Sequence, residues 1–244
     1  MNDVVLVSGG TGGIGEACVR LFASKGHPVL FLTSAQPEKA AALALEMRES
    51  GASVDWKQCD LRDPNQVRTT IRDLLSVWHR IDILINNAGV SFTGLLTDMS
   101  DEDWNRIFDV NVRGAFLLCR ELLPGMISRR KGNIVNIASM WGETGASCEV
   151  AYSSSKAALI GLTKALAKEA GPSGIRVNCI TPGVIDTRMN AHLSEGDLAD
   201  LADSTPLGRI GTPGEVAEAV FFLSENSSSF ITGQILGVNG GFVI

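Results

Sequence analysis

The chain carries one tyrosine, Tyr152, and a lysine stands four positions after it, Lys156. Residues four apart on a helix share one face, so the phenol and the ammonium are expected to lie close together. A phenol has a pKa of about 10, and a nearby positive charge favours the phenolate and lowers this pKa toward neutrality. Such a tyrosine serves as a general acid when a carbonyl is reduced and as a general base when the alcohol is oxidised. The pair therefore indicates oxidoreductase chemistry.

A glycine-rich segment, Gly9–Gly15, follows an apolar run at the start of the chain. Glycines permit a tight turn and let the backbone approach a pyrophosphate at the N-terminus of the next helix. Gly9, Gly13 and Gly15 are assigned to these roles, although their spacing is G-x-x-x-G-x-G rather than G-x-G-x-x-G. A P-loop is excluded because Glu16 stands where its lysine belongs. The segment predicts a dinucleotide site, and a glycine-rich turn without a ligand is the alternative.

Further polar residues follow the later apolar runs in a definite order. The ordered set is Asn86-Asn87-Ala88-Gly89, Asn111, Ser139, Tyr152-Ser153-Ser154-Ser155-Lys156 and Thr181-Pro182-Gly183. Together with the glycine-rich segment, this set resembles the short-chain dehydrogenase/reductase family from Val4 to Gly241. A Y-x-x-x-K spacing alone is common by chance, whereas the full ordered set is highly specific.

The resemblance implies a catalytic tetrad of Asn111, Ser139, Tyr152 and Lys156. Ser139 can donate a hydrogen bond to the substrate oxygen, on which hydride transfer builds negative charge. The resemblance also implies that Lys156 reaches the nicotinamide ribose and that Asn111 holds a water for proton transfer. The alternatives are an ordinary helix tyrosine with a solvated lysine, and an asparagine that only bonds a neighbouring backbone.

The implied cofactor is a nicotinamide dinucleotide, and no metal site is expected. In dinucleotide folds an acid after the second strand binds the ribose 2′-hydroxyl, and a basic residue accommodates a 2′-phosphate. No acid stands near Thr33, and the arginines that the family places near Gly12 or Ser34 are missing too. Since the hydroxyls of Thr33 and Ser34 can bond a phosphate, NADP(H) is favoured over NAD(H). The expected cofactor contacts are Gly9, Thr11, Gly12, Gly13, Ile14, Gly15, Thr33, Ser34, Asp60, Leu61, Asn87, Ala88, Gly89, Tyr152, Lys156, Pro182, Gly183, Ile185 and Thr187.

Residues 181–187, 206–209 and 231–241 resemble 3-oxoacyl-acyl-carrier-protein reductases, which makes a 3-oxoacyl thioester the first substrate prediction. Residues 139–150, on the expected substrate side, instead resemble bacterial reductases of 5-aminopentanone-modified elongation factor P. Glu143 and Glu149 suit an amine-bearing substrate electrostatically, and two solvent-facing charges are the alternative. Cys148 is expected to be inert packing.

Two further hypotheses concern the protein partner and whether the protein is an enzyme. Arg129, Arg130 and Lys131 form a candidate docking patch for the acidic acyl-carrier protein, and a solvated helix end is the alternative. A non-catalytic nucleotide-sensing protein on the same fold is the hypothesis of another class. It predicts a damaged catalytic set, whereas all four tetrad residues are present.

The elements that must position these residues alternate along the chain. Strands are expected at Val4–Ser8, Val29–Thr33, Val54–Gln58, Ile83–Asn86, Asn133–Ala138, Arg176–Thr181 and Ile235–Val238, and helices at Gly15–Lys25, Pro37–Ser50, Pro64–Trp78, Asp101–Ile127, Val150–Ala170 and Pro213–Ser224. Asp63 or Pro64, Ser100 and Thr212-Pro213 are plausible helix starts. The alternation predicts an α/β fold: a Rossmann-type, doubly wound parallel sheet of about seven strands with helices on both faces.

One domain is expected over residues 1–244. Residues 187–211 interrupt the alternation, because they are polar, rich in small residues and without a strong period. They are expected to form a substrate flap, mobile or folded as a short helical lid, and a surface excursion without function is the alternative.

Composition narrows the partners. The net charge of −6 argues against nucleic acid or an anionic membrane, since both need a basic patch. No signal peptide is expected, no apolar stretch approaches membrane-spanning length, and the five cysteines show no metal or disulfide spacing. A reduced cytoplasmic protein is expected, and the resemblance implies a homotetramer.

Overall fold

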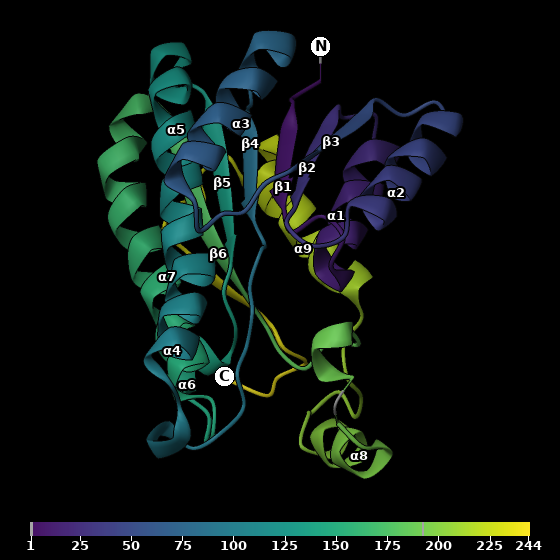
Figure 1. The fold of residues 1–244 in the computed structure, drawn as a ribbon, viewed down its shortest axis with the longest axis vertical. Helices are drawn as coiled ribbons and strands as arrows, with labels where there is room; N and C mark the ends of the chain where they lie inside the picture. Colours follow the sequence, from purple (N-terminus) through teal and green to yellow (C-terminus); the bar gives the residue numbers. More distant parts are fainter. Residues whose placement is uncertain (1, 192) are drawn as a thin grey trace.

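The computed structural model describes residues 2–191 and 193–244. Its centre is one sheet of seven parallel strands in the order β3-β2-β1-β4-β5-β6-β7 (Figure 1). The strands are β1 (Val5–Ser8), β2 (Val29–Thr33), β3 (Val54–Gln58), β4 (Ile83–Asn86), β5 (Gly132–Ile137), β6 (Ile175–Pro182) and β7 (Ile235–Val238). The predicted Rossmann-type doubly wound sheet is confirmed.

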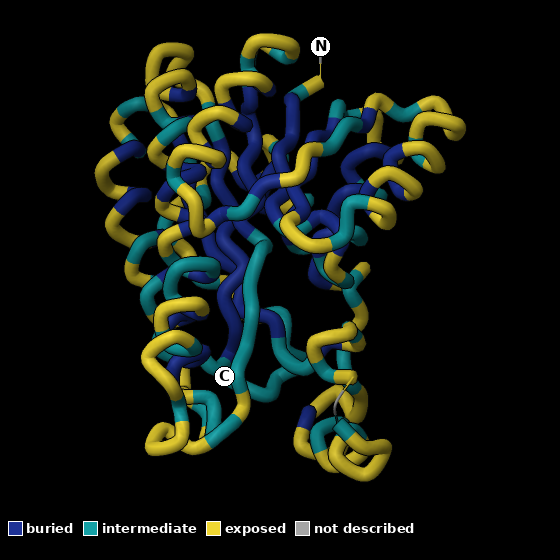
Figure 2. The backbone as a smooth tube through the Cα atoms, in the orientation of Figure 1, coloured by how far each residue is buried: buried dark blue, intermediate teal, exposed yellow. Residues whose placement is uncertain are grey.

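Helices cover both faces of the sheet, which keeps most strand residues out of water (Figure 2). Leu6 and Leu30 face a core shared with α3, α5 and α7, whereas Val7 and Phe31 face a core shared with α1, α2 and α9. This two-sided burial explains why the strands are apolar without alternation. The helices are α1 (Gly13–Ser24), α2 (Pro37–Glu49), α3 (Pro64–Trp78), α4 (Asp101–Phe108), α5 (Gly114–Arg129), α6 (Trp141–Thr144), α7 (Val150–Ala170), α8 (Glu195–Asp203) and α9 (Pro213–Ser224).

The predicted helix starts are real caps. The Asp63 side chain accepts hydrogen bonds from the first turn of α3, and Ser100 does the same for α4. Thr212 forms a reciprocal capping box with Glu215 at α9. Because capping is a local interaction between close neighbours in the chain, residue type alone could indicate these boundaries.

The helix predicted at Asp101–Ile127 is wrong as one element. It consists of α4, a π-helical segment (Asp109–Arg113) and α5. A π-helical turn admits an extra residue, so the helix face shifts at this point. The periodicity of the sequence does not reveal such a short change of pitch. Smaller differences concern α1, which begins at Gly13, and β5 and β6, which each begin one residue earlier than predicted.

Residues 187–211 contain a short 3-10 turn (Arg188–Asn190) and helix α8. The α8 helix lies apart from the main body and is largely exposed (Figures 1 and 2). The segment returns to the sheet where Ile185 forms a parallel bridge with Gly211. Across the described ranges of the chain, no helix has the length and apolar character needed to span a bilayer.

Candidate functional site

The carboxyl ends of β1 and β4 meet the glycine-rich segment, where the strand order of the sheet reverses. The side chain of Asn87, which follows β4, joins this strand to the end of β1: its Nδ2 donates to the carbonyls of Ser8 and Gly9 at 3.1 and 3.0 Å. A Cβ atom on Gly15 would lie 2.1 Å from the Gly9 oxygen, so only glycine fits at this position. The turn at the start of α1 is therefore built by close backbone approach, as a pyrophosphate cradle requires.

A cavity of about 790 Å³ runs along this edge of the sheet. Seventeen of the nineteen expected cofactor residues line it: Gly9, Thr11, Gly12, Gly13, Ile14, Thr33, Ser34, Asp60, Asn87, Ala88, Gly89, Tyr152, Lys156, Pro182, Gly183, Ile185 and Thr187. Gly15 and Leu61, the other two expected contacts, are not among the lining residues. Gly15 is packed inside the turn, and the side chain of Leu61 is buried in the core near Gly114.

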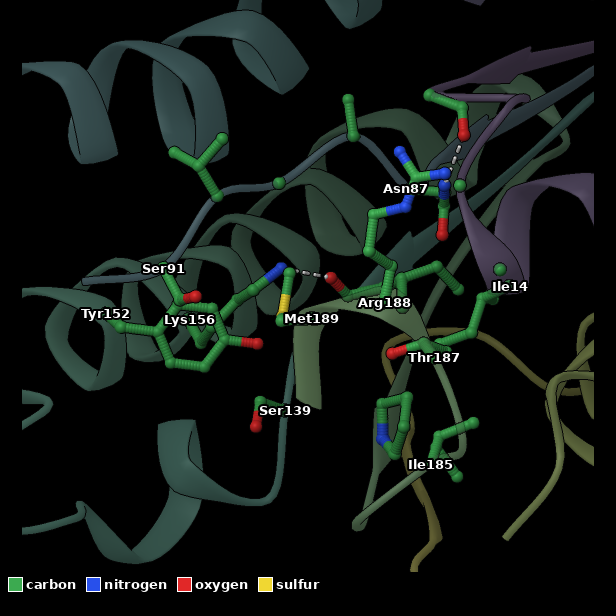
Figure 3. A pocket seen from close by; sticks show the side chains of 18 of the residues that line it. Ile14, Asn87, Ser91, Ser139, Tyr152, Lys156, Ile185, Thr187, Arg188 and Met189 are labelled. Carbon is green, nitrogen blue, oxygen red and sulfur yellow. Dashed lines mark hydrogen bonds between the residues drawn. The ribbon is translucent and has the colours of Figure 1, made fainter. Parts of the chain in front are cut away.

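Three of the four predicted catalytic residues line the opposite end of the cavity. Ser139 follows β5, whereas Tyr152 and Lys156 come from the first turns of α7. The Lys156 Nζ donates to the Ile137 carbonyl at 2.8 Å and lies 5.6 Å from the centroid of the Tyr152 ring. Figure 3 shows the Tyr152 phenol oxygen between Lys156 and Ser139. Tyr152 and Lys156 are only 8% and 3% exposed, so this polar group is shielded from water.

Burial changes the acidity of both residues. It raises the pKa of Tyr152 to about 12, although a hydrogen bond with Ser139 acts in the opposite direction. It also lowers the pKa of Lys156 to about 8. The expectation that the Tyr152 pKa falls toward neutrality is therefore wrong for this geometry, because burial of the phenolate raises this pKa more than the hydrogen bond with Ser139 lowers it. At neutral pH Tyr152 is a phenol and can donate a proton.

Asn111 does not line the cavity. It sits fully buried in the π-helical segment, where its Oδ1 accepts from the Val90 N–H and its Nδ2 donates to the Val90 carbonyl and to the Ser155 Oγ. Ser155 in turn donates to the Tyr152 carbonyl at 2.7 Å. The side chain of Asn111 thus joins the loop after β4 to the first turn of α7. Sequence reasoning missed Ser155, although it stands inside the Y-x-x-x-K motif.

Two cations that sequence reasoning did not single out lie near the adenosine end of the cavity, Lys39 outside its lining and Arg62 within it. The hydroxyls of Thr11 and Thr33 lie 3.1 Å apart, and the Nζ of Lys39, from the first turn of α2, donates to the Thr11 carbonyl at 2.7 Å. Arg62 lines the cavity and pairs with Asp60, and its guanidinium holds the pKa of that carboxyl below its usual range. Lys39 lies six residues beyond Thr33 and reaches back only because α2 begins beside the glycine-rich segment.

The substrate end is lined by Met140, Trp141 and Glu149, and by Met189 and Leu201 from the flap. Glu149 raises the pKa of Tyr152, although less than burial does, so it lies within electrostatic reach of the phenol. Glu143 is exposed outside this lining. Cys148 also lies outside it. Of the two predicted acidic contacts, the structure brings only Glu149 to the cavity.

A family model described as enoyl-(acyl carrier protein) reductase matches residues 9–243. The uncharacterized oxidoreductase YmfI of Bacillus subtilis is 40% identical, with 99% of each chain covered. The 3-oxoacyl-[acyl-carrier-protein] reductase FabG of Chlamydia muridarum is 39% identical, with 99% of this chain and 97% of that protein covered. The chain belongs to the short-chain dehydrogenase/reductase family.

The fold agrees with this assignment. A crystal structure from Agrobacterium tumefaciens, provisionally described as a gluconate dehydrogenase, superposes with a TM-score of 0.95 at 32% identity over 99% of this chain and 97% of that one. As a short-chain dehydrogenase/reductase, the protein is an oxidoreductase, which disfavours the non-catalytic hypothesis. Within residues 2–191 and 193–244, no group of three or more His, Cys, Asp or Glu side chains is arranged to hold a metal ion.

The basic patch lies at the wrong edge of this reductase for the predicted docking role. Arg129 donates to the Ile81 carbonyl just before β4, and Lys131 pairs with Asp3 just before β1. Arg130 donates to the Pro172 carbonyl. All three cations therefore contact segments that lie just before the amino ends of strands, whereas the cavity opens at the carboxyl ends of the strands. The alternative reading as a helix end describes them better.

Proposed function

We propose that the protein is an NADP(H)-dependent carbonyl reductase whose substrate is a 3-oxoacyl thioester carried by acyl-carrier protein, giving the 3-hydroxyacyl product. The observation that carries this proposal is the buried Tyr152, Lys156 and Ser139 group at one end of a cavity whose other end is a closed glycine turn. The names of several relatives, among them the FabG of Chlamydia muridarum, support the thioester.

The residues present fit a nicotinamide dinucleotide. Gly12, Gly13 and Ile14, at the N-terminus of α1, line the cavity, and a helix N-terminus after a tight glycine turn is suited to a pyrophosphate. The loop Asn87–Gly89 and Thr187 line the same cavity toward the catalytic end. When bound, the reduced nicotinamide supplies a hydride to the carbonyl carbon.

The protein's own residues handle the oxygen. Ser139 Oγ and the Tyr152 hydroxyl donate hydrogen bonds to the carbonyl oxygen, which becomes negative during reduction. Tyr152 then transfers its proton to this oxygen, and its raised pKa keeps that proton available across the neutral range. Lys156, held on the Ile137 carbonyl, stabilises the phenolate left behind when it is in its charged form. Asn111 holds the Val90 loop and, through Ser155, the backbone of Tyr152.

The preference for NADP(H) is supported by Lys39. Its ammonium donates to the Thr11 carbonyl at 2.7 Å and pairs with Glu16 at 2.8 Å, close to the end of β2 where a 2′-phosphate is expected. Lys39→Met is expected to weaken NADPH binding about two- to fivefold and to leave NADH binding unchanged, as for an exposed ion pair. Fluorescence titration with both cofactors tests this, with the exposed Lys168→Met on α7 as the matched control. Equal weakening of both cofactors contradicts the assignment.

Steady-state reduction of acetoacetyl-CoA by NADPH tests the substrate class. Turnover of a 3-oxoacyl thioester to the 3-hydroxyacyl product is expected. Failure to reduce any 3-oxoacyl thioester, with NADPH binding intact, would overturn this choice.

A second candidate substrate is an amine-bearing ketone such as 5-aminopentanone on elongation factor P. The observation that favours it is Glu149, an acid in the wall of the cavity close to Tyr152. Glu149→Gln should then impair reduction of the amine substrate, whereas Glu143→Gln, which changes an exposed acid on the neighbouring helix α6, should not. An unchanged KM for the amine substrate in Glu149→Gln contradicts this candidate. The one-domain organisation over residues 1–244, the mobility of the flap at 187–211, the homotetramer and the cytoplasmic location stay predictions.

A further inference from the structure

The last six residues, Asn239–Ile244, are here named the C-terminal strap. They follow β7 and are folded by Asn239, whose Nδ2 donates to the Val243 carbonyl and whose Oδ1 accepts from the Gly241 N–H, both at 3.0 Å. The Phe242 N–H donates to the Asn239 carbonyl at 3.1 Å. The strap therefore has a defined conformation rather than the loose end that chain termini usually have.

One side of the strap contacts the wall of the substrate end. The Phe242 ring packs edge-on against Trp141, with centroids 5.5 Å apart and planes at 89°. Trp141 lines the cavity, and its backbone N–H donates to the Ser139 Oγ at 3.2 Å. The next residue, Gly142, packs on α7 so closely that a Cβ there would lie 2.8 Å from the Lys156 carbonyl carbon. Phe242 thus supports a short helix that touches two of the proposed catalytic residues.

The other side of the strap contacts the base of the flap. The Leu207 N–H donates to the Gly240 carbonyl at 3.1 Å. A Cβ on Gly240 would lie 2.5 Å from the Thr205 methyl, which shows how closely the two segments meet. A second cavity of about 430 Å³ lies between the strap and the flap base, and shares Val184 and Ile185 with the main cavity. The strap is therefore in contact with Trp141 in the wall of the main cavity and with the base of the flap, which lies outside the lining of that cavity.

We propose that the C-terminal strap is part of the substrate site, and that Phe242 is a positioning residue that sets, through Trp141, the size of carbonyl substrate that the enzyme accepts. The proposal rests on the proposed carbonyl reductase function. With Phe242 present, Trp141 is held against the cavity and the wall is narrow. Without it, Trp141 gains freedom to move toward the strap, and the cavity gains room for a longer acyl group. A purely stabilising strap would affect every substrate alike.

The test compares Phe242→Ala with Phe242→Tyr, which keeps the ring, and with Phe230→Ala. Phe230 is fully exposed and precedes β7 at the amino edge of the sheet, so it controls for loss of a surface phenylalanine. For each variant, kcat and KM are measured with acetoacetyl-CoA and with 3-oxodecanoyl-CoA. Edge-to-face aromatic pairs are weak, so we expect the ratio of the kcat/KM values, long over short, to rise about two- to tenfold in Phe242→Ala. Phe242→Tyr and Phe230→Ala should keep the wild-type ratio.

An unchanged ratio in Phe242→Ala, or an equal fall for both substrates, overturns the proposal. Circular dichroism melting checks that the variants fold, and Phe242→Leu serves if the alanine variant does not. If the wild-type protein reduces neither thioester, the proposed function fails, and the contact between Phe242 and Trp141 is then tested by fluorescence. The fluorescence of Trp141, taken as the difference from Trp141→Phe in each background, should then be quenched more readily by acrylamide in Phe242→Ala. Unchanged quenching in that case overturns the role of the strap.

Discussion

Lys156→Met is expected to make the folded protein more stable at neutral pH while abolishing activity. The wild-type ammonium is buried and has one short hydrogen bond, to the Ile137 carbonyl. Burial lowers its pKa from 10.5 to about 8, so the fold disfavours the charged lysine relative to the unfolded chain. Below pH 8 the whole of this penalty is present. As the pH rises from 8 to 10.5, the unfolded state binds more protons than the folded state, and wild-type stability increases.

Each pKa unit corresponds to about 1.4 kcal/mol, so the fall from 10.5 to about 8 corresponds to about 3 kcal/mol at pH 7. Methionine removes this penalty and fills a similar volume. It also leaves the Ile137 carbonyl without its donor, which costs about 1 kcal/mol. The free energy of unfolding should therefore rise by about 2 kcal/mol at pH 7. At pH 10 most of the wild-type penalty is gone, and the two proteins should be about equally stable.

Urea denaturation followed by circular dichroism at pH 7 and pH 10 measures both values. Lys168→Met, an exposed lysine near the end of the same helix, is the control and should change stability little at either pH. The reasoning is refuted if Lys156→Met is less stable than wild type at pH 7, or if its stability relative to wild type is the same at both pH values.

Three further predictions concern the same site. Tyr152→Phe should lower kcat for carbonyl reduction about 10²- to 10⁴-fold with unchanged NADPH binding, measured by NADPH oxidation and fluorescence titration; equal rates in both proteins defeat the proton-donor role. Gly15→Ala places a Cβ 2.1 Å from the Gly9 oxygen, so NADPH affinity should fall at least about tenfold by calorimetry, and wild-type affinity contradicts the cradle. Asn111→Ala removes the side-chain partner of the Val90 N–H and carbonyl and the donor to the Ser155 Oγ, so urea denaturation should show a loss of about 1–3 kcal/mol, and an unchanged midpoint contradicts its structural role.

Much of the fold could be predicted because its signals are local. The strands β2, β3, β4 and β7 have the predicted bounds, since short Val- and Ile-rich runs between turn residues have few other ways to fold. The prediction at residues 101–127 was wrong because a π-helical turn leaves no mark in the apolar period.

For the site too, relations between close neighbours in the chain could be predicted, and contacts between distant segments could not. Tyr152 and Lys156 lie one helical turn apart, so the sequence alone determined that they share a face. It also indicated that the glycine-rich segment, Ser139 and Pro182-Gly183 follow successive strands, and all of these line the cavity. Only the tertiary structure decided what lies near them. Lys39 contacts Thr11, which is 28 positions earlier in the chain, and Phe242 contacts Trp141, which is 101 positions earlier. Arg129 lies at the edge of the sheet opposite the cavity. The pKa of Tyr152 rises rather than falls for the same reason: burial is the sum of contacts from distant segments, and spacing along the chain does not contain it.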